Sequence, residues 1–526
     1  MSTSVLSRIG IASLIMMASV FLSRLMGIAR VMVIAHIGGA DASVDAYQTA
    51  FTLPEILNHL LASGFLSITF IPIFSEYLAK EKEGEGWRVF STILTCLGSV
   101  LILLILLSVI FAPQLVSVVS SGRTDPAWQA QAVRMTRIIL PAQFCFFVGG
   151  LFMAVQFAKE RFFLPALAPL VYNLCIICGG VLLGPVLGME GFSWGVLAGA
   201  ALGNLVIQYI GARKAGMVFR PSFNVLDPEL RRYLRLTLPL MLGLTMVFST
   251  EVLFRFFGSY LEGGGIAVLD YGLRIMMALV AFFGQAVGVA SYPYLARIAA
   301  KEGLKELNQL LNRLLQYLSL VLPVSVLLIV LRREIIIILL QHGRFDAVTT
   351  DLTSHVLIFL LAGAAGFAVQ TVVVRGFYAV QKTLLPAVVG SMVVLGTLPL
   401  YIMGVHLMGI GGVALAISLS STLQVVILFM VWNRYSRNRQ SREVYICYLK
   451  MGLFSLLAIP LLFVFKQILP DRITDGSILG SLVTLMLTGA FFICILAAGA
   501  RLLKINELQQ AMERIGQRAK MRIKRS

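Results

Sequence analysis

The chain has 526 residues, of which 58% are hydrophobic and 13% charged, and its mean hydropathy is +0.89. A soluble globular domain is nearer half apolar and a quarter charged, so this composition excludes that class. The formal net charge is +18. However, no loop between the apolar runs is long enough for a folded nucleic-acid-binding module, so nucleic acid is not an expected partner.

Long apolar runs recur along the chain and predict an all-α polytopic membrane protein. Runs such as 93–111, 314–331 and 479–500 are each long enough to cross a hydrocarbon core of about 30 Å as a helix. We expect about fourteen transmembrane helices. Their predicted positions are near residues 10–37, 46–71, 88–118, 132–157, 163–185, 191–212, 233–258, 265–293, 311–331, 353–380, 384–405, 409–432, 446–467 and 478–502.

Two segments, 72–166 and 293–387, repeat each other at a constant offset of 221 residues. The matching positions are Pro72 and Pro293, 79–81 and 300–302, 122–125 and 343–346, and 164–166 and 385–387. An offset that covers six spans, an even number, returns the chain to the same side of the membrane, so the repeats are predicted to be parallel. Such duplication is typical of alternating-access transporters, with the substrate site between the halves.

The repeat predicts two six-helix lobes followed by two appended helices. The expected parts are an N-terminal lobe over 1–220, a C-terminal lobe over 221–440, an appended helix pair over 441–503 and a basic tail over 504–526.

Basic residues gather in alternate loops, which predicts the orientation of the chain in the membrane. These loops lie within 80–88, 159–161, 213–235, 297–305 and 434–442. This asymmetry places both termini in the cytoplasm, and we expect the basic tail to lie against anionic headgroups. The loop with Arg332, Arg333 and Arg344 is an exception to the pattern.

Arginines inside predicted spans are the main candidates for function, because a charge at the bilayer centre costs at least about 2.5–3.5 kcal/mol. Arg24 and Arg30 lie in the first span and Arg274 in the eighth. Three arginines around a cavity between the lobes would suit a diphosphate, since guanidinium groups bind phosphate oxygens bidentately and stay charged. The alternative is that Arg24 or Arg30 reaches an interface or pairs with an acid such as Asp45.

Other polar residues in the spans carry weaker signals. Glu251 and Arg255 are four residues apart, and a structural ion pair on one helix face is the favoured interpretation. For His59, neutral hydrogen bonding is favoured over proton relay, and Asn58 is a candidate hydrogen-bonding residue of the cavity. The sequence has no nucleotide-binding loop, catalytic motif or metal-ligand cluster, so we expect no enzyme activity, cofactor or metal.

Several motifs taken together resemble one family of membrane proteins. They are 23–30 (SRLMGIAR), 45–47 (DAY), 53–54 (LP), Gly64, 70–72 (FIP), Arg274, 339–346 (LLQHGRFD) and 376–379 (GFYA). The chain resembles, over essentially its whole length, the MurJ/MviN family of bacterial lipid II flippases, within the multidrug/oligosaccharidyl-lipid/polysaccharide exporter superfamily.

The resemblance implies export of a polyprenyl-diphosphate-linked peptidoglycan precursor, lipid II, from the inner to the outer leaflet of the bacterial cytoplasmic membrane. The headgroup would pass through the cavity between the lobes, and the lipid tail would run in a groove made with the last two helices. In such a family, residues matching Arg24, Arg30, Arg274 and Asp45 are functionally required. Membrane lipids are expected partners, together with transient contacts to cell-wall synthesis enzymes.

Three departures from the family pattern keep alternatives open. Asn58 and His59 stand where typical members carry two basic residues, Ser63 stands where they carry a glutamate, and Leu273 replaces an acid. We therefore count Asn58, His59 and Ser63 among the candidate substrate-binding residues. The alternative is a paralogue that moves another polyprenyl-linked glycan, such as an exopolysaccharide or O-antigen precursor. A cation-coupled multidrug antiporter and a polytopic membrane enzyme rank lower, because the cavity is predicted to be basic and carboxylates do not cluster.

Overall fold

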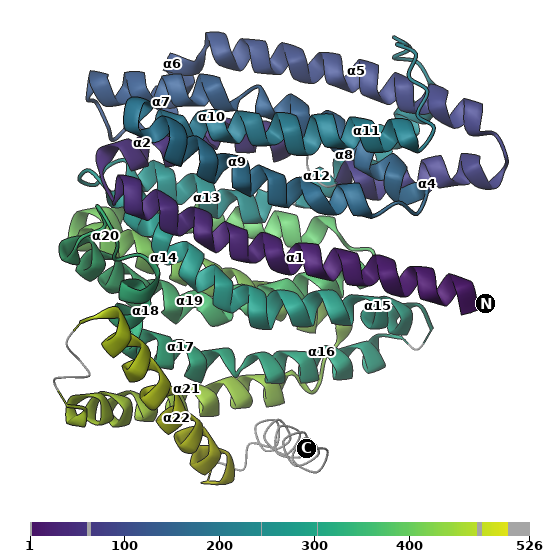
Figure 1. Ribbon diagram of the computed structural model, residues 1–526. Coiled ribbons are helices and arrows are strands. Elements are labelled where there is room, and N and C mark those ends of the chain that lie inside the picture. The colour runs from purple at the N-terminus through teal and green to yellow at the C-terminus, as the bar shows by residue number, and fades with distance from the viewer. Residues whose placement is uncertain (1–2, 60–64, 244, 302, 471–475, 503–526) are drawn as a thin grey trace. The chain divides into compact units, whose positions relative to one another are not determined.

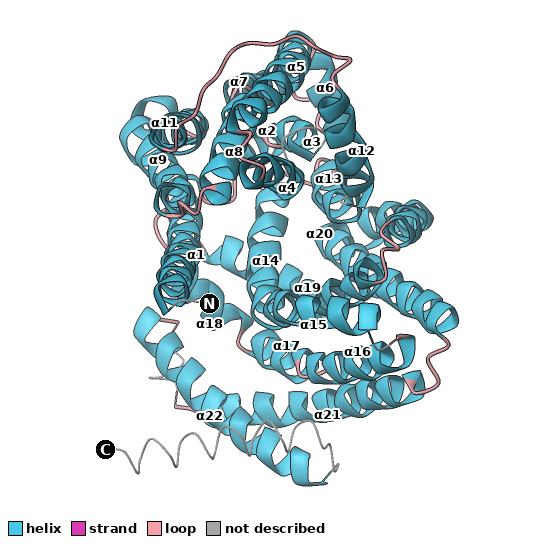
Figure 2. Ribbon diagram, turned by 90° about the vertical axis from the view of Figure 1, so that its right-hand side faces the viewer, coloured by secondary structure: helices cyan, strands magenta, loops and turns pink. Residues whose placement is uncertain are grey.

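The computed structural model describes residues 3–59, 65–243, 245–301, 303–470 and 476–502. These residues form helices joined by turns and loops, and no strand occurs among them (Figures 1 and 2). The prediction of an all-α polytopic membrane protein is therefore confirmed. The candidate substrate-binding residue Ser63 lies outside the described residues.

The chain divides into two compact units. The first runs to Ala267 and includes His342–Phe345, and the second comprises the remaining residues from Val268 onward. The helices of the first unit are α1 (Thr3–Gly38), α2 (Ala42–Ala50), α3 (Thr52–Leu57), α4 (Phe65–Ala79), α5 (Glu83–Ile110), α6 (Ala112–Val119), α7 (Pro126–Ile139), α8 (Ala142–Ala158), α9 (Phe163–Leu187), α10 (Glu190–Gly199), the π-helical η2 (Ala200–Val206), α11 (Ile207–Lys214), α12 (Pro228–Gly243) and α13 (Thr245–Gly258).

The second unit contains most of α14 and all later helices. These are α14 (Gly265–Val280), the π-helical η3 (Ala281–Gln285), α15 (Ala286–Lys301), α16 (Leu304–Leu318), α17 (Val321–Val330), α18 (Arg332–Leu339), α19 (Ala347–Ala379), α20 (Leu384–Ser436), α21 (Ser441–Ile468) and α22 (Ile478–Leu502). The predicted lobe boundary at residue 220 and the other predicted domain limits stay predictions.

Eleven stretches of the described residues are long and apolar enough to cross a membrane. One of them, α20, contains two of the predicted spans: Gly409 has φ 55°, and a Cβ built on Gly404 would lie 2.6 Å from the carbonyl oxygen of Gly412, so the chain folds back on itself there. The predicted spans 46–71 and 233–258 are not among the eleven. Within span 46–71 the helix is interrupted at Phe51, between α2 and α3, and span 233–258 includes residue 244, which lies outside the described residues. The count of fourteen stays a prediction.

The backbone reproduces the repeat that the sequence shows. Helices α8 and α19 end at Ala158 and Ala379, and α9 and α20 begin at Phe163 and Leu384, each pair 221 residues apart. Left-handed residues recur at the same offset: Glu160 and Gln381 have φ 57° and 59°, Gly188 and Gly409 have φ 57° and 55°, and Gly216 and Arg437 have φ 88° and 50°. Because L residues seldom adopt positive φ, these matched turns show that the two copies share local structure.

Close helix contacts in the first unit explain part of the glycine content of its apolar segments. Helix α9 packs between α1 and α10. A Cβ built on Gly195 of α10 would lie 2.6 Å from the carbonyl oxygen of Cys175 in α9, and one on Gly179 would lie 2.6 Å from the carbonyl oxygen of Gly191. Glycine therefore lets the two backbones approach, as small residues do between membrane helices.

The core of the second unit forms where α16, α19 and the second half of α20 meet. Trp432 is fully buried, stacks edge-on against Phe377 and donates its indole N–H to Oδ1 of Asn308 at 2.9 Å. The last helix pair attaches to the same unit: α21 packs against α16 and α17, and Phe465 stacks on Phe491 of α22.

Candidate functional site

Helix α1 carries the two arginines predicted for the first span. The Arg24 side chain is exposed and that of Arg30 is half-buried. Within the part of the chain that the structure describes, neither guanidinium forms an ion pair with a carboxylate. A charge held in an apolar helix without an acid partner is available for an anionic ligand or a lipid headgroup.

Asp45 lies on α2 with its side chain fully buried. One carboxylate oxygen accepts the backbone N–H of Ala267 at 2.8 Å, and the other accepts the backbone N–H of Gly264 at 2.7 Å and Nη2 of Arg123 at 3.1 Å. Asp45 thus fixes the turn at 264–267 to α2. Sequence reasoning missed Arg123 as its partner, because 78 residues separate the two.

Asn58 and His59 follow the short helix α3, and both side chains are half-buried. Nδ1 of His59 lies 2.8 Å from the carbonyl oxygen of Glu55. Since a carbonyl oxygen can only accept, Nδ1 donates this bond, an arrangement in keeping with the predicted hydrogen-bonding role of His59.

Glu55 itself is a charged residue that sequence reasoning missed. Both of its carboxylate oxygens accept from Arg255 on α13: Nη2 donates to Oε1 at 3.1 Å, and Nη1 donates to Oε2. Arg255 is 4% exposed and Glu55 25% exposed. The sequence points only to Glu251 as the acid for Arg255, because spacing on one helix is visible in a sequence and a contact between distant helices is not.

Arg274 lies on α14 and donates from Nε to Oδ2 of Asp270 at 2.6 Å. Its side chain is 39% exposed, whereas Asp270 is 8% exposed. The neighbouring Leu273 is buried. Sequence reasoning noted the missing acid at Leu273 but overlooked Asp270, although the spacing of four residues was a usable signal.

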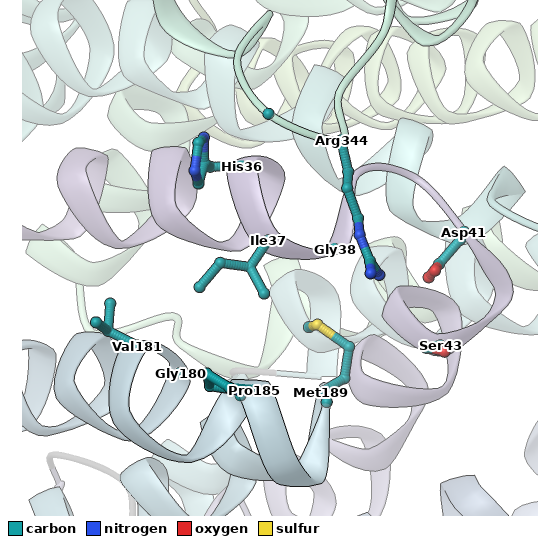
Figure 3. A pocket seen from close by; sticks show the side chains of 13 residues that line it. His36, Ile37, Gly38, Asp41, Ser43, Gly180, Val181, Pro185, Met189 and Arg344 are labelled. Carbon is teal, nitrogen blue, oxygen red and sulfur yellow. The ribbon is translucent and has the colours of Figure 1, made fainter.

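A cavity of about 810 Å³ lies in the first unit, between the end of α1 and the end of α9 (Figure 3). Its polar lining comes from His36, Asp41, Ser43 and Arg344. The apolar lining residues are Ile37, Val181, Pro185 and Met189, and five glycines complete the wall. None of the predicted substrate-binding residues that the structure describes lines this cavity.

The segment that brings Arg344 to this cavity is held against α1. The backbone N–H of Arg344 donates to the carbonyl oxygen of His36 at 3.0 Å. A Cβ built on Gly343, whose φ is 63°, would lie 2.4 Å from the same oxygen. These contacts hold Arg344, one of the arginines in the loop that does not follow the predicted charge pattern, against the end of α1.

The predicted site residues are thus divided between the two units. Arg24, Arg30, Asp45, Asn58 and His59 belong to the first unit. Arg274 belongs to the second. Their convergence on one substrate cavity stays a prediction.

Long apolar helices, π-helical turns, broken helices and intramembrane arginines together define a multi-pass membrane protein of the transporter class. Two solved structures share this fold. A lipid II flippase MurJ in an inward closed conformation superposes with a TM-score of 0.76 over 93% of this chain and 99% of that chain, at 22% identity. An inward-facing multidrug resistance MATE family transporter of the MOP superfamily gives 0.64 over 79% and 94%, at 13% identity.

Sequence comparison identifies the family. The family model described as "Lipid II flippase MurJ" matches residues 34–488. A probable lipid II flippase MurJ of Rhizobium tropici is 30% identical over 426 residues, 78% of each chain. The lipid II flippase MurJ of Burkholderia cenocepacia is 27% identical over 417 residues, covering 78% of this chain and 81% of that protein. The chain belongs to the MurJ family of lipid II flippases.

Proposed function

We propose that this protein moves lipid II from the inner to the outer leaflet of the bacterial cytoplasmic membrane by alternating access. The match of the family model across residues 34–488 carries the proposal. The repeat of residues 72–166 at 293–387 supports it, because such duplication is the usual basis of alternating access.

Arg24, Arg30 and Arg274 are the residues proposed to bind the diphosphate of the substrate. The guanidinium group is planar and permanently charged, and it can donate two parallel hydrogen bonds to phosphate oxygens. Asp270 orients Arg274 through its bond to Nε. Asp45 acts as a positioning residue, since its carboxylate is buried and occupied by three donors.

Asn58, His59 and Ser63 are proposed to contact the uncharged part of the headgroup. Neutral amide, imidazole and hydroxyl groups bind sugar hydroxyls and peptide groups without the desolvation cost of an unpaired charge. The substrate reaches them as a lipid-linked glycan diphosphate, and transient contacts with cell-wall synthesis enzymes would supply or remove it.

The proposed orientation places both termini in the cytoplasm. Basic residues at the ends of α4, α11 and α20 and at the start of α12 support this orientation, because Lys and Arg are retained on the cytoplasmic side.

A second candidate substrate is another polyprenyl-diphosphate glycan. Asn58 and His59 favour it, because they stand where typical family members carry two basic residues. A site without these two charges would suit a headgroup with fewer acidic groups. Both candidates use the same arginines for the diphosphate, so substitution of Arg24 does not distinguish them.

Transport in proteoliposomes tests the proposal and separates the candidates. Fluorescent lipid II and a fluorescent polyprenyl-diphosphate glycan without the pentapeptide would each be reconstituted with the full chain, and a membrane-impermeant quencher would report the label that changes leaflet. We expect faster exchange of lipid II than of the second lipid. Preference for the second lipid would transfer the assignment to it, and exchange of neither above protein-free vesicles would contradict both.

A further inference from the structure

The connection between α11 and α12 exposes an unusual density of apolar side chains. Five large hydrophobic residues within 218–226 are exposed. They are Val218 at 45%, Phe219 at 41%, Phe223 at 74%, Val225 at 69% and Leu226 at 70%. Large apolar residues gathered on one exposed segment mark a contact surface, whereas isolated ones are ordinary.

The backbone of this connection is bound to polar side chains of α5. The backbone N–H of Arg220 donates to Oγ of Ser91 at 3.1 Å, and that of Ser222 donates to Oγ1 of Thr95 at 3.3 Å. The Ser222 carbonyl oxygen accepts from Sγ of Cys96 at 3.8 Å. Figure 2 draws the connection as a long loop that passes outside α5.

The position of these contacts along α5 indicates how deep in the membrane they lie. The helix is 28 residues long, about 42 Å at 1.5 Å per residue, which exceeds the hydrocarbon thickness of about 30 Å. Arg88 is its last charged residue, and no charge follows until Arg123. Ser91, Thr95 and Cys96 therefore lie where the uncharged part of the helix begins, at the boundary between headgroups and hydrocarbon.

The arrangement of polar and apolar groups in this connection is thus the reverse of that in a loop exposed to water. Its polar backbone groups face α5 and its apolar side chains face outward. Irregular backbone at membrane depth requires protein partners for its N–H and C=O groups, and Ser91, Thr95 and Cys96 supply them here. The exposed apolar surface continues along α5 at Val100 and Leu103.

Basic residues surround the exposed apolar group. Residues 213–235 contain six basic and two acidic side chains. Asp227 is buried and accepts the backbone N–H of Glu229, and Glu229 accepts from Arg232, which also binds Glu76. The other basic side chains, Arg213, Lys214, Arg220, Arg231 and Arg235, are exposed and form no ion pair with a described carboxylate.

We propose that residues 217–227 form an interfacial strap that, together with Arg231 and Arg235 of α12, binds anionic phospholipids in the leaflet at this end of the first unit. Phe223, Val225 and Leu226 enter the acyl-chain region. Arg220, Arg231 and Arg235 bind the phosphate groups of anionic headgroups, since basic side chains near an anionic surface attract such lipids. This proposal rests on the protein being a membrane protein and not on its transported substrate.

Spin-label accessibility tests the insertion. The background is a full-length variant in which the six native cysteines are replaced, with Ser at Cys96 so that a hydrogen-bond donor remains. A nitroxide would be attached at Phe223→Cys or Leu226→Cys, and its accessibility to oxygen and to a soluble nickel chelate would be measured in nanodiscs. Leu103→Cys on the lipid-facing side of α5 and Glu85→Cys at its exposed start are the matched controls. We expect positions 223 and 226 to resemble 103, with oxygen a more effective collider than a soluble nickel chelate. A nickel preference like that at 85 would overturn the insertion and favour a protein-docking surface.

Lipid retention tests the headgroup part. Wild-type protein and the triple variant Arg220→Gln/Arg231→Gln/Arg235→Gln would be purified from nanodiscs of mixed phosphatidylglycerol and phosphatidylcholine, and bound lipids counted by native mass spectrometry. The control Arg134→Gln/Arg137→Gln/Arg333→Gln removes the same charge elsewhere. We expect phosphatidylglycerol affinity to fall roughly tenfold in the strap variant and to change little in the control. An equal loss of phosphatidylglycerol affinity in both variants, or no loss in either, would overturn the headgroup assignment.

Discussion

Glu55 and Arg255 form a bidentate ion pair between positions 200 residues apart in the sequence. The pair joins α3 to α13, and α3 begins directly after the break at Phe51 in the predicted span 46–71. A broken helix loses part of its own backbone hydrogen bonding, so an ion pair beside the break helps to fix its geometry. Arg255 also donates to Oγ1 of Thr52 at 3.5 Å, which attaches it to the same short helix.

Removal of one partner of this pair should destabilise the protein strongly. In Glu55→Gln the buried Arg255 guanidinium loses its bidentate bond to the Glu55 carboxylate, and breaking a buried pair costs about 3–5 kcal/mol. Thermal unfolding in detergent measures the loss. The double variant Glu55→Gln/Arg255→Met should recover much of it, because the buried guanidinium is removed together with the Glu55 carboxylate. Lys82→Met, at an exposed pair with Glu85, serves as control and should cost less than about 1 kcal/mol. Equal costs at both pairs would contradict the account.

Asp45→Asn should loosen the turn at 264–267. The amide keeps one acceptor oxygen, so one of the backbone N–H groups of Gly264 and Ala267 loses its partner, and the charge opposite Arg123 disappears. A hydrogen bond to a charged group contributes about 1.5–3 kcal/mol, so amide hydrogen exchange there should accelerate at least tenfold. Asp41→Asn, which alters an exposed N-cap side chain nearby, is the control. Unchanged exchange in Asp45→Asn would show that the carboxylate does not hold the turn.

Gly195→Ala should impair packing between α9 and α10. The new Cβ would lie 2.6 Å from the carbonyl oxygen of Cys175 and 2.8 Å from Cα of Ile176, both of them backbone atoms that cannot rotate away. Overpacking of this kind costs about 1–3 kcal/mol, which a lower unfolding temperature would reveal. Gly27→Ala on α1 is the matched control, because nothing lies within 4 Å of its Cβ position. If both variants unfold at the same temperature, close approach is not the reason for Gly195.

Asp346 should make the start of α19 sensitive to acid. Its Oδ1 accepts the backbone N–H of Thr349 at 2.8 Å, and this bond lowers the pKa of the carboxyl below its usual value. Because the folded pKa is the lower one, the stabilisation is complete above the unfolded pKa of about 3.9 and is lost as pH falls through the folded pKa.

Comparison of Asp346→Ala with wild type over pH 2–7 tests this expectation. The variant should be less stable near neutral pH by about 1 kcal/mol, the usual value of an N-cap, and the difference should shrink in acid. Asp351→Ala, on the exposed face of the same helix, should show little difference at any pH. A difference at Asp346 that stays constant with pH would contradict the capping role.

The helical class and the repeat could be predicted from the sequence, because apolar run length and a constant offset are local properties of the chain. The left-handed residues Glu160 and Gln381 confirm the repeat in the backbone. The break at Phe51 within span 46–71 was not predicted, because the apolar composition continues across it. The partners Glu55 and Arg123 were missed for another reason: long-range ion pairs depend on tertiary packing, which hydrophobic periodicity does not encode.

The site was predicted only as a set of residues that are costly to bury. Arg24 and Arg274 could be identified because charge in an apolar span is conspicuous. The environment of Arg274 was only partly predictable, since Asp270 lies one turn earlier and not at the neighbouring position 273.

Growth complementation tests the central claim most directly. The full chain would be expressed in a bacterium whose own lipid II flippase can be shut off, with membrane insertion verified. We predict that the wild-type chain sustains growth and that Arg24→Ala and Arg274→Ala, at equal abundance, do not. Arg88→Ala, which removes an exposed arginine at the start of α5, should still rescue growth. Failure of the inserted wild-type chain, or full rescue by both Arg24→Ala and Arg274→Ala, would contradict lipid II transport through these arginines.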